Sequence, residues 1–307
     1  MAHVRNTQEL FCVSVADYVS PHGWPPLGSK RTAAANIYRA ATPYTPTTPN
    51  RKSGITLQQL AAIRRHLLVH PFASTRETCL WAAFTTAFYA LLRKSNVACA
   101  TAATSAPPAQ PVPGPAGLRQ PPPPPSPVLR RGDVTRQPDG SLLLTFQCTK
   151  TRQPGSGRPQ LQTPLPRITT PLRDAHSGAP TATHALCPTA ALSAYLRRTA
   201  GRPLSEPLFG WTDSRSGEWR RLTHAVFVST LKDLLRREGV DATRYSGQSF
   251  RRGGASFAHN TVGLPHLYIK ALGDWLSNAF ELYIEADDHL RATAQRRVAE
   301  VVARTLP

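Results

Sequence analysis

A short stretch near the C-terminal end of the chain combines residue types that could act on a phosphodiester bond. Between Tyr245 and Glu285 lie two adjacent arginines, Arg251 and Arg252, and a tyrosine, Tyr283. Phosphodiester transfer needs a nucleophile, cations over the developing negative charge, and a proton donor for the leaving oxygen. A guanidinium donates to two phosphate oxygens at once. A tyrosine nucleophile forms a phosphotyrosyl bond, which conserves bond energy and lets a cut strand be rejoined without ATP.

The overall charge of the chain agrees with a polyanionic partner. Its 307 residues contain 37 Lys+Arg against 18 Asp+Glu, which gives a formal net charge of +19 at pH 7. Most of the positive charge comes from arginine, the better bidentate phosphate ligand. Because the charge is spread along the chain, we expect a nucleic acid partner. A generally basic composition without a bound polyanion is the alternative.

Several other classes of protein are disfavoured by the sequence. The five cysteines include no C-x-x-C pair, and their odd number argues against a disulfide framework or a zinc ribbon. No histidine pair has the H-x-x-x-H spacing beside a carboxylate, so we expect no metal site of that kind. No segment approaches about 18 consecutive apolar residues, and the first residues lack the apolar core of a secretory signal.

The chain divides into an arm and one structured domain. Residues 1–53 are basic, weakly patterned and rich in turn-forming residues, with at most a short helix over Val13–Val19. Residues 54–307 form the domain. Within it, residues 101–127 are an Ala/Pro-rich, low-complexity insertion that favours polyproline II or disorder. We interpret this insertion as a spacer loop, and a docking segment for a partner is the alternative.

Helices frame the domain. Thr56 is predicted to cap the first helix, and Ser74 with Glu77 forms a capping-box sequence before a nearly uninterrupted apolar helix. That apolar helix is expected at the centre of the core, with Arg93 at its C-terminal end. Further helices are expected at Pro188–Gly201, Thr223–Gly239, Phe250–His259, Pro265–Leu272 and Ser277–Ala286, and the tail from His289 is amphipathic.

A small sheet lies between the two groups of helices. Asp139-Gly140 is a tight-turn signal, Leu142–Cys148 reads as a strand with Lys150 directly after it, and Gln160–Leu165 reads as the returning strand. Leu129–Val134 is predicted as a third, edge strand. Because no repeating strand-helix-strand units are visible, the predicted fold class is mainly α with a small antiparallel β-sheet (α+β).

These motifs together resemble the catalytic domain of the tyrosine recombinase (phage integrase) family, in its eukaryotic mobile-element, DIRS-like or Crypton-like, branch. The resemblance rests on SFRRGGA, LGDW and LYIE, with LLRKSNV and TKT further upstream, and covers roughly residues 54–290. It implies the DNA breaking-rejoining catalytic fold and a nuclear enzyme without cofactor or metal that integrates or recombines mobile-element DNA through a 3′-phosphotyrosyl intermediate. The implied partners are double-stranded DNA and further copies of the chain, as a dimer or tetramer on DNA.

The resemblance also assigns roles to individual residues. The implied catalytic set is Tyr283, Arg93, Arg251, Lys150, Gln248, Asp274 and Trp275. Tyr283 aligns with the nucleophile, the two arginines with the phosphate ligands, and Lys150 with the β-hairpin lysine that protonates the leaving 5′ oxygen. Asp274 and Trp275 stand at the family's His/Trp position. Residues expected to contact DNA are Arg93, Lys94, Lys150, Arg152, Arg251, Arg252 and Lys270.

Two departures from the family pattern bear on activity. Gln248 stands where the family has histidine. Glutamine can hydrogen-bond a phosphate oxygen but exchanges no proton near neutral pH, so proton transfer would rest on Lys150 or water. In addition, residues 1–53 stand in place of the family's helical core-binding domain, which is truncated or absent, so the clamp around DNA would be incomplete.

Three alternatives therefore stay open. The chain could be a catalytically decayed or domesticated DNA-binding protein, a type IB topoisomerase-like enzyme, or an interaction protein that uses its proline-rich insertion. Taken singly, the residues also have ordinary explanations: Tyr283 as a core tyrosine, Arg93 as a cation at a helix C-terminus, and Lys150 as a lysine that protects a sheet edge. Their joint occurrence in the expected order favours the enzyme.

Overall fold

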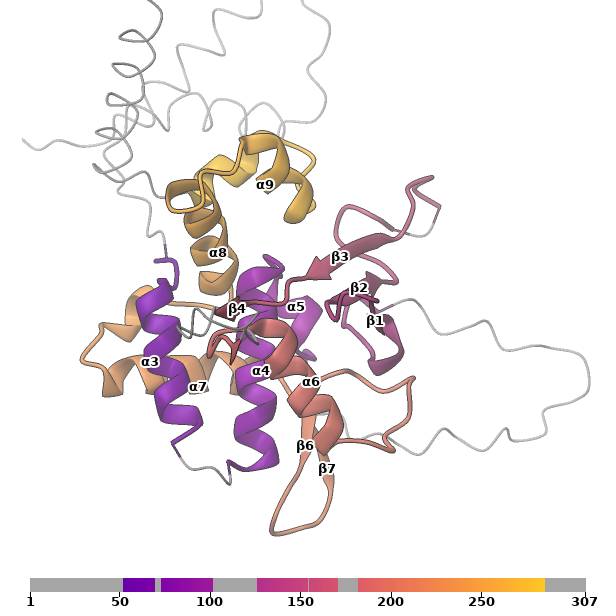
Figure 1. The fold of residues 1–307 in the computed structure, drawn as a ribbon, viewed down its shortest axis with the longest axis vertical. Coiled ribbons are helices and arrows are strands. Elements are labelled where there is room, and N and C mark those ends of the chain that lie inside the picture. Colours follow the sequence, from indigo (N-terminus) through magenta and orange to yellow (C-terminus); the bar gives the residue numbers. More distant parts are fainter. Residues whose placement is uncertain (1–51, 70–72, 102–125, 154, 171–181, 285–307) are drawn as a thin grey trace, which may run out of the picture. The chain divides into compact units, whose positions relative to one another are not determined.

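The computed structural model describes residues 52–69, 73–101, 126–153, 155–170 and 182–284, with only the main chain for Ala182 and Tyr283. These residues belong to one compact unit that begins at Lys52. They form helices and three small antiparallel sheets, which confirms the predicted fold class (Figure 1). The predicted helix over Val13–Val19, most of the 101–127 insertion and the tail from His289 lie outside the described residues.

The first two helices begin where the sequence predicts. α3 (Leu57–Leu67) begins at Thr56, whose hydroxyl accepts a hydrogen bond from the Gln59 amide while the Gln59 side chain accepts one from Thr56. α4 (Thr75–Tyr89) begins at Ser74 with the same reciprocal pair. Each capping box satisfies two amide groups that the first turn of a helix leaves unbonded.

The later helices are α5 (Lys94–Val97), α6 (Pro188–Arg198), α7 (His224–Arg237), α8 (Ser249–Asn260) and α9 (His266–Leu272), with 3-10 helices η1 (Arg131–Asp133), η2 (Ala242–Arg244) and η3 (Asn278–Tyr283). Of these, α6, α7, α8 and α9 lie where the sequence predicts a helix, whereas α5, η1 and η2 were not predicted. Gly201 and Gly239, which follow α6 and α7, adopt φ angles of 85° and 71°. This left-handed conformation suits glycine and ends the two helices as predicted.

α4 lies at the centre of the core, as its apolar sequence predicts. Every residue from Thr78 to Phe88 is buried. Phe84 stacks on Phe250 of α8 with ring centroids 4.8 Å apart, and it meets Phe227 of α7 edge-on at 5.0 Å. This aromatic cluster holds α7 and α8 against the same helix, so α8 is fixed where Arg251 reaches the end of α4.

The main sheet has the strand order β1-β2-β3, and both strand pairs are antiparallel. Its strands are β1 (Val134–Arg136), β2 (Leu142–Phe146) and β3 (Leu161–Leu165). Alternate residues of β2 are buried, which is the pattern of a strand with one face on the core. Gly140, with a φ of 79°, lies in the predicted turn before β2. The connection from β2 to β3 carries Lys150.

The predicted edge strand over Leu129–Val134 is wrong in position. η1 occupies its middle, and β1 begins only at Val134. The Asp133 carboxylate accepts hydrogen bonds from the Arg130 amide and the Gln147 side chain, each at 2.8 Å. A short polar side chain that bonds the nearby main chain competes with strand pairing, so a turn replaces the first part of the expected strand.

Two small hairpins are absent from the sequence predictions. β4 (Thr169–Thr170) pairs with β5 (Ala182–Thr183), and β6 (Gly210–Thr212) pairs with β7 (Trp219–Arg221). The second hairpin is held by a buried tyrosine of α6, Tyr195, whose hydroxyl donates to the Gly210 carbonyl at 2.8 Å and accepts from the Gly210 amide at 2.9 Å. Strands this short show little alternation of apolar and polar residues, so the sequence does not predict them. The β6–β7 hairpin is fixed by Tyr195, which lies in another element.

The predicted α-helix over Ser277–Ala286 is a 3-10 helix, η3, in the described residues, which end at Ile284. Only Phe280 is buried among the residues from Ala279 to Leu282. A single buried position per turn does not require the 3.6-residue period of an α-helix. Phe280 packs in a second apolar cluster with Leu91, Ala255, Ala258, Ile269 and Trp275. No described helix is both long and apolar enough to span a membrane.

Candidate functional site

One small cavity brings together residues that are far apart in the sequence. Arg93 and Arg251 line it, along with Thr149, Gly273 and Asp274. Its volume is about 10 Å³, which is near the minimum needed to hold one water molecule. The cavity therefore marks a nearly closed junction between the end of α4, the β2–β3 connection and the turn after α9.

Arg251 is the buried cation of this junction, with 2% of its surface exposed. Its two terminal nitrogens donate to the carbonyl oxygens of Leu91 and Gly273, both at 2.6 Å. The face of the guanidinium covers the Trp275 ring, with its central carbon 3.7 Å from the ring centroid. The guanidinium thus joins α8 to the end of α4 and to the turn after α9.

Two glycines let α8 approach its neighbours closely enough for these contacts. A Cβ atom at Gly253 would lie 2.0 Å from the Ile55 carbonyl oxygen, and one at Gly254 would lie 2.1 Å from the Phe88 carbonyl oxygen. Both clashes are with main-chain atoms, which cannot move away as a flexible side chain can. The glycine pair after the two arginines is therefore a packing requirement of this site.

Arg93, which lines the cavity, and Gln248 lie in two turns of the chain. Arg93 precedes α5 and is partly buried, and its amide donates to the Asn96 side chain at 3.2 Å. Gln248 precedes α8 and is exposed. The two turns touch, because a Cβ atom at Gly247 would lie 2.5 Å from the side chain of Lys94. Four of the predicted positions, Arg93, Lys94, Gln248 and Arg251, thus come from adjoining segments.

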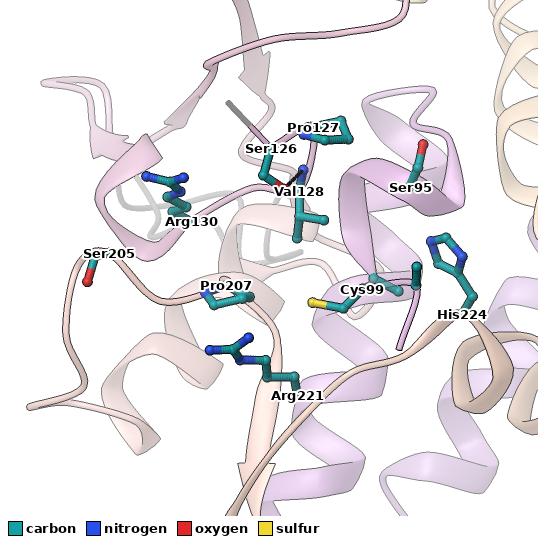
Figure 2. Close-up of a pocket in the computed structure, with 12 residues that line it drawn as sticks. Ser95, Cys99, Ser126, Pro127, Val128, Arg130, Ser205, Pro207, Arg221 and His224 are labelled. Atoms are coloured by element: carbon teal, nitrogen blue, oxygen red, sulfur yellow. Dashed lines mark hydrogen bonds between the residues drawn. The ribbon is translucent and has the colours of Figure 1, made fainter. Parts of the chain in front are cut away.

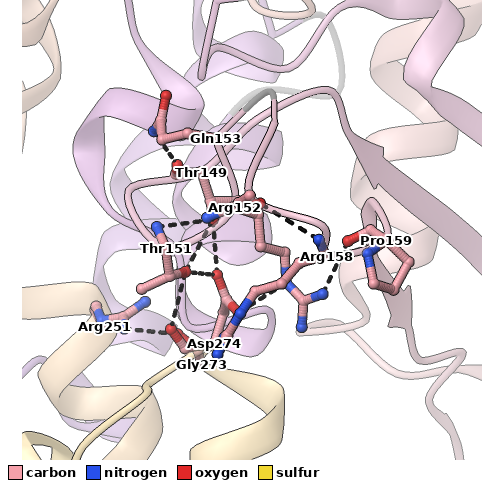
Figure 3. A network of polar contacts seen from close by, with 10 residues as sticks. Thr149, Thr151, Arg152, Gln153, Arg158, Pro159, Arg251, Gly273 and Asp274 are labelled. Atoms are coloured by element: carbon pink, nitrogen blue, oxygen red, sulfur yellow. Dashed lines mark hydrogen bonds and ion pairs between the residues drawn. The ribbon is translucent and has the colours of Figure 1, made fainter.

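Asp274 binds the connection that carries Lys150. Its carboxylate accepts hydrogen bonds from the Thr149 hydroxyl at 2.7 Å and from the Thr151 hydroxyl, and it pairs with the Arg152 Nε at 2.9 Å (Figure 3). Thr149 and Asp274 are 125 residues apart in sequence. Lys150, between the two threonines, is itself exposed.

The electrostatics of Asp274 follow from these partners. Burial alone would raise the pKa of its carboxyl, but the hydrogen bonds from Thr151, Thr149 and Arg152 outweigh burial and lower the pKa below its usual value. The carboxylate is therefore charged near neutral pH. A charged carboxylate accepts hydrogen bonds but has no proton to donate near neutral pH.

Backbone strain also gathers at the cavity. Among the described residues, the non-glycine positions with positive φ are Leu91 at 49° and Asp274 at 50°, and both line the cavity. The Arg251 side chain bonds the Leu91 carbonyl and the carbonyl of Gly273, the residue before Asp274. Such conformations cost free energy, persist only where surrounding contacts impose them, and are concentrated at functional sites.

The main chain next to Tyr283 is bonded to α8. The Arg252 Nη2 donates to the Leu282 carbonyl at 3.1 Å, and Lys270 of α9 donates to the Asn278 side chain at 3.3 Å. Both cations belong to the predicted DNA-contact set, and in this structure both hold η3. Tyr283 directly follows Leu282, and Leu282 is bonded to Arg252, the residue after Arg251.

Two contributors were missed by the sequence predictions, Thr149 and Thr151. Their signal is weak, because a threonine on either side of a strand-end lysine is common. Arg152, which is predicted to contact DNA, bonds Asp274 and the Pro159 carbonyl in this structure, the latter at 2.8 Å. The sequence predictions did not include this use of its guanidinium within the protein.

A larger cavity of about 450 Å³ contains none of the predicted catalytic residues (Figure 2). Cys99, Arg130, Arg221 and His224 are among its lining residues. Burial raises the pKa of the Cys99 thiol, and burial together with the charge of Lys94 lowers the pKa of His224. Both shifts oppose a thiolate–imidazolium pair of Cys99 and His224. Across the described part of the chain, no cluster of three His, Cys, Asp or Glu side chains is arranged to hold a metal ion.

Comparisons with known proteins give similarity in structure only. No family model and no curated protein sequence matches this chain. The XerA recombinase structure is 13% identical, with a TM-score of 0.49, over 87% of this chain and 73% of that one. Two XerH site-specific recombinase complexes, with difH substrate before cleavage and with palindromic difH after cleavage, are 11% and 10% identical, each with a TM-score of 0.47. They match 80% and 79% of this chain and about half of their own length, 53% and 51%. At this level the likeness assigns no residue role and no activity.

Proposed function

We propose that the chain cuts and rejoins double-stranded DNA by the chemistry of a tyrosine recombinase. Tyr283 attacks a phosphodiester and forms a 3′-phosphotyrosyl bond, while the 5′ oxygen leaves with a proton. Arg93 and Arg251 bind the phosphate, and Lys150 supplies the proton. The reaction needs no external energy source, because the tyrosine ester keeps the energy of the broken bond for rejoining.

One observation carries this proposal: Arg93 and Arg251 line a single cavity although they lie in distant segments. The same cavity includes Asp274, whose carboxylate holds the loop of Lys150. Leu91 and Asp274, the two residues with positive φ, both line it. Convergence of separate cationic segments and backbone strain at one junction is expected of a site that stabilises charge in a transition state. Independent surface arginines would have no reason to converge.

The small volume of the cavity sets a requirement on the reaction. Because the guanidinium of Arg251 is buried, a phosphate reaches it only if the junction opens when DNA binds. Arg93, partly exposed at the edge of the cavity, makes the first contact in this scheme.

The finer features of the proposal are a nuclear protein, recombination or integration of mobile-element DNA, and a dimer or tetramer on paired sites. They rest on the motif resemblance of the stretch around Arg251 and Tyr283. In this scheme residues 54–307 are the catalytic domain. The net charge of +19 supports DNA as the partner.

The test is covalent capture on DNA. Because the target sequence is unknown, the probe is a pool of random-sequence duplexes with a nick near one position, so that cleavage releases a short fragment and traps the protein on the strand. The expected result is an adduct that survives denaturant in the wild-type protein and is lost in Tyr283→Phe. Binding of the pool without any adduct, at equal folding, would exclude the enzyme.

A DNA-binding protein that no longer cleaves is the second candidate. Two observations favour it: Gln248 stands exposed before α8 in place of an acid–base residue, and Arg251 binds protein carbonyls. In that case the duplex pool is retained in a salt-dependent way by both the wild-type protein and Tyr283→Phe. The adduct assay therefore separates the two candidates directly.

A further inference from the structure

We infer that Asp274 is a positioning residue that latches the Lys150 loop to the C-terminal segment, and that it thereby fixes the proton donor of the proposed reaction. The inference rests on the proposed function for its catalytic part. The latch itself is a structural statement about the loop of Thr149 to Arg152, and it can be tested without any activity.

The first support is that both carboxylate oxygens of Asp274 bind this one loop. Oδ2 accepts from the hydroxyls of Thr149 and Thr151, and Oδ1 pairs with the Nε of Arg152 (Figure 3). Asp274 is only 6% exposed, so these bonds lie away from bulk water. Hydrogen bonds to a charged group are about twice as strong as neutral ones.

The second support is the shape of the loop. The amide of Thr149 donates to the Arg152 carbonyl at 3.0 Å, and the amide of Arg152 donates to the Thr149 carbonyl at 3.3 Å. The Thr149 hydroxyl also accepts from the Arg152 amide at 3.2 Å. Lys150 and Thr151 thus lie at the tip of a closed turn. Because residues on either side of Lys150 bind Asp274, its main chain is fixed while its side chain stays exposed.

The third support is that the residues next to Asp274 bind the other cation of the site. The Gly273 carbonyl accepts from Arg251, and the Trp275 ring lies under the same guanidinium. A Cβ atom at Gly273 would collide with the Trp275 ring at 1.6 Å, so the absence of a side chain at Gly273 leaves room for the ring in this position. Three consecutive residues therefore couple the Lys150 loop to Arg251.

Direct contact of the Asp274 carboxylate with DNA is the competing explanation, and the charges oppose it. A carboxylate repels a phosphate, and both of its oxygens already accept hydrogen bonds from the protein. Because both carboxylate oxygens bind the loop, the carboxylate is positioned to orient Lys150 and not to contact the DNA.

The test compares two leaving groups in the same duplex pool. One carries the ordinary 5′ oxygen, which needs protonation, and the other a bridging 5′ sulfur, which leaves as a thiolate without an acid. Thr149→Val with Thr151→Val, and separately Asp274→Asn, should slow cleavage of the oxygen substrate about 10-fold or more, because small displacements of a catalytic group are costly. Cleavage of the sulfur substrate should change less than about twofold, as for Lys150→Ala. Asp139→Asn, in the turn between β1 and β2, is the matched control and should change neither.

Equal losses on both substrates would overturn the inference, because they would mean that Asp274 supports the nucleophile or the fold and not the proton donor. A second measurement is independent of activity. Trypsin cuts after lysine and arginine, so the latch predicts faster cleavage at Lys150 and Arg152 in the two variants than in the wild type at equal global stability. Unchanged trypsin cleavage at Lys150 and Arg152 would show that Asp274 does not hold the loop. If the wild type forms no adduct but the loop is protected, the proposed function fails and the latch stands.

Discussion

The guanidinium of Arg251 lies over the indole ring of Trp275, with its central carbon 3.7 Å from the ring centroid. The same guanidinium donates to the carbonyls of Leu91 and Gly273. A buried cation is stable only when its charge and its donors are satisfied, and here an aromatic face and two carbonyls do so. Arg251 therefore has a structural task in addition to the role proposed for it in phosphate binding.

Replacing Arg251 should destabilise the fold. In Arg251→Met two buried carbonyls lose their donors, and we expect a loss of about 2 to 4 kcal/mol in the free energy of unfolding. Urea denaturation measures it. Arg237→Met, at the exposed end of α7, is the control and should change stability by less than about 0.5 kcal/mol. An equally small effect at Arg251 would show that the buried contacts contribute nothing.

Gly253→Ala should reverse the usual effect of alanine in a helix. Helix propensity alone predicts a stabilisation of about 1 kcal/mol. A Cβ atom here would lie 2.0 Å from the Ile55 carbonyl oxygen, so we expect a destabilisation of about 2 kcal/mol or more. Thermal and urea unfolding report the sign. Gln58→Ala, at an exposed position of α3, is the control and should be within about 0.5 kcal/mol of wild type. A more stable Gly253→Ala protein would contradict the close packing of α8.

Asp274 should make stability depend on pH in the acid range. Its pKa in the folded protein lies below the usual value, whereas an unfolded aspartate titrates near pH ~3.9. The unfolded state therefore binds more protons in this window, so the contribution is complete above about pH 4 and is lost as the pH falls through the folded-state pKa. Asp274→Asn should remove this part of the acid dependence in unfolding curves, while Asp233→Asn on α7 should retain it. If the free energy of unfolding depends on pH in the same way in the wild type and in Asp274→Asn, the lowered pKa of the Asp274 carboxyl is contradicted.

Exposed lysines at the site should contribute to DNA affinity through phosphate contacts. Lys94 and Lys150 are both exposed. Replacing either by alanine should weaken binding and reduce the slope of log K against log salt by about 1, because one fewer counterion is released. Fluorescence anisotropy with the random duplex pool measures the slope. Lys232→Ala on α7, outside the cavity, should leave the slope at its wild-type value; a loss there as large as at the site would indicate diffuse charge attraction.

Gln248→His should restore proton transfer if that step limits cleavage. General acid–base help is typically worth about 10²- to 10⁴-fold, so we expect at least about a 10-fold faster adduct formation, with a new dependence on pH near ~6.5. Gln248→Asn separates size from proton exchange and should give no gain. A histidine variant no faster than wild type would mean that Lys150 or water already completes the transfer.

The regular elements could be read from local sequence because their signals are local. The capping boxes at Thr56 and Ser74, the glycines after α6 and α7, and the alternation in β2 each lie within a few residues. The failures occurred where a distant or side-chain contact decides the local conformation. Asp133 bonds the Arg130 amide and turns the expected edge strand into η1, and burial of Phe280 alone leaves η3 without an α-helical period.

The amino-acid sequence by itself determined the fold class, the order of the cationic segments and the chemistry that they could perform, because residue type and spacing carry that information. It could not determine which cation is buried or which carboxylate holds which loop. The tertiary structure decided that Arg251 is enclosed by Leu91, Gly273 and Trp275, and that Asp274 binds the loop of Lys150 across 125 residues of chain. Burial and long-range hydrogen bonds arise only when separate segments pack, so no local pattern encodes them.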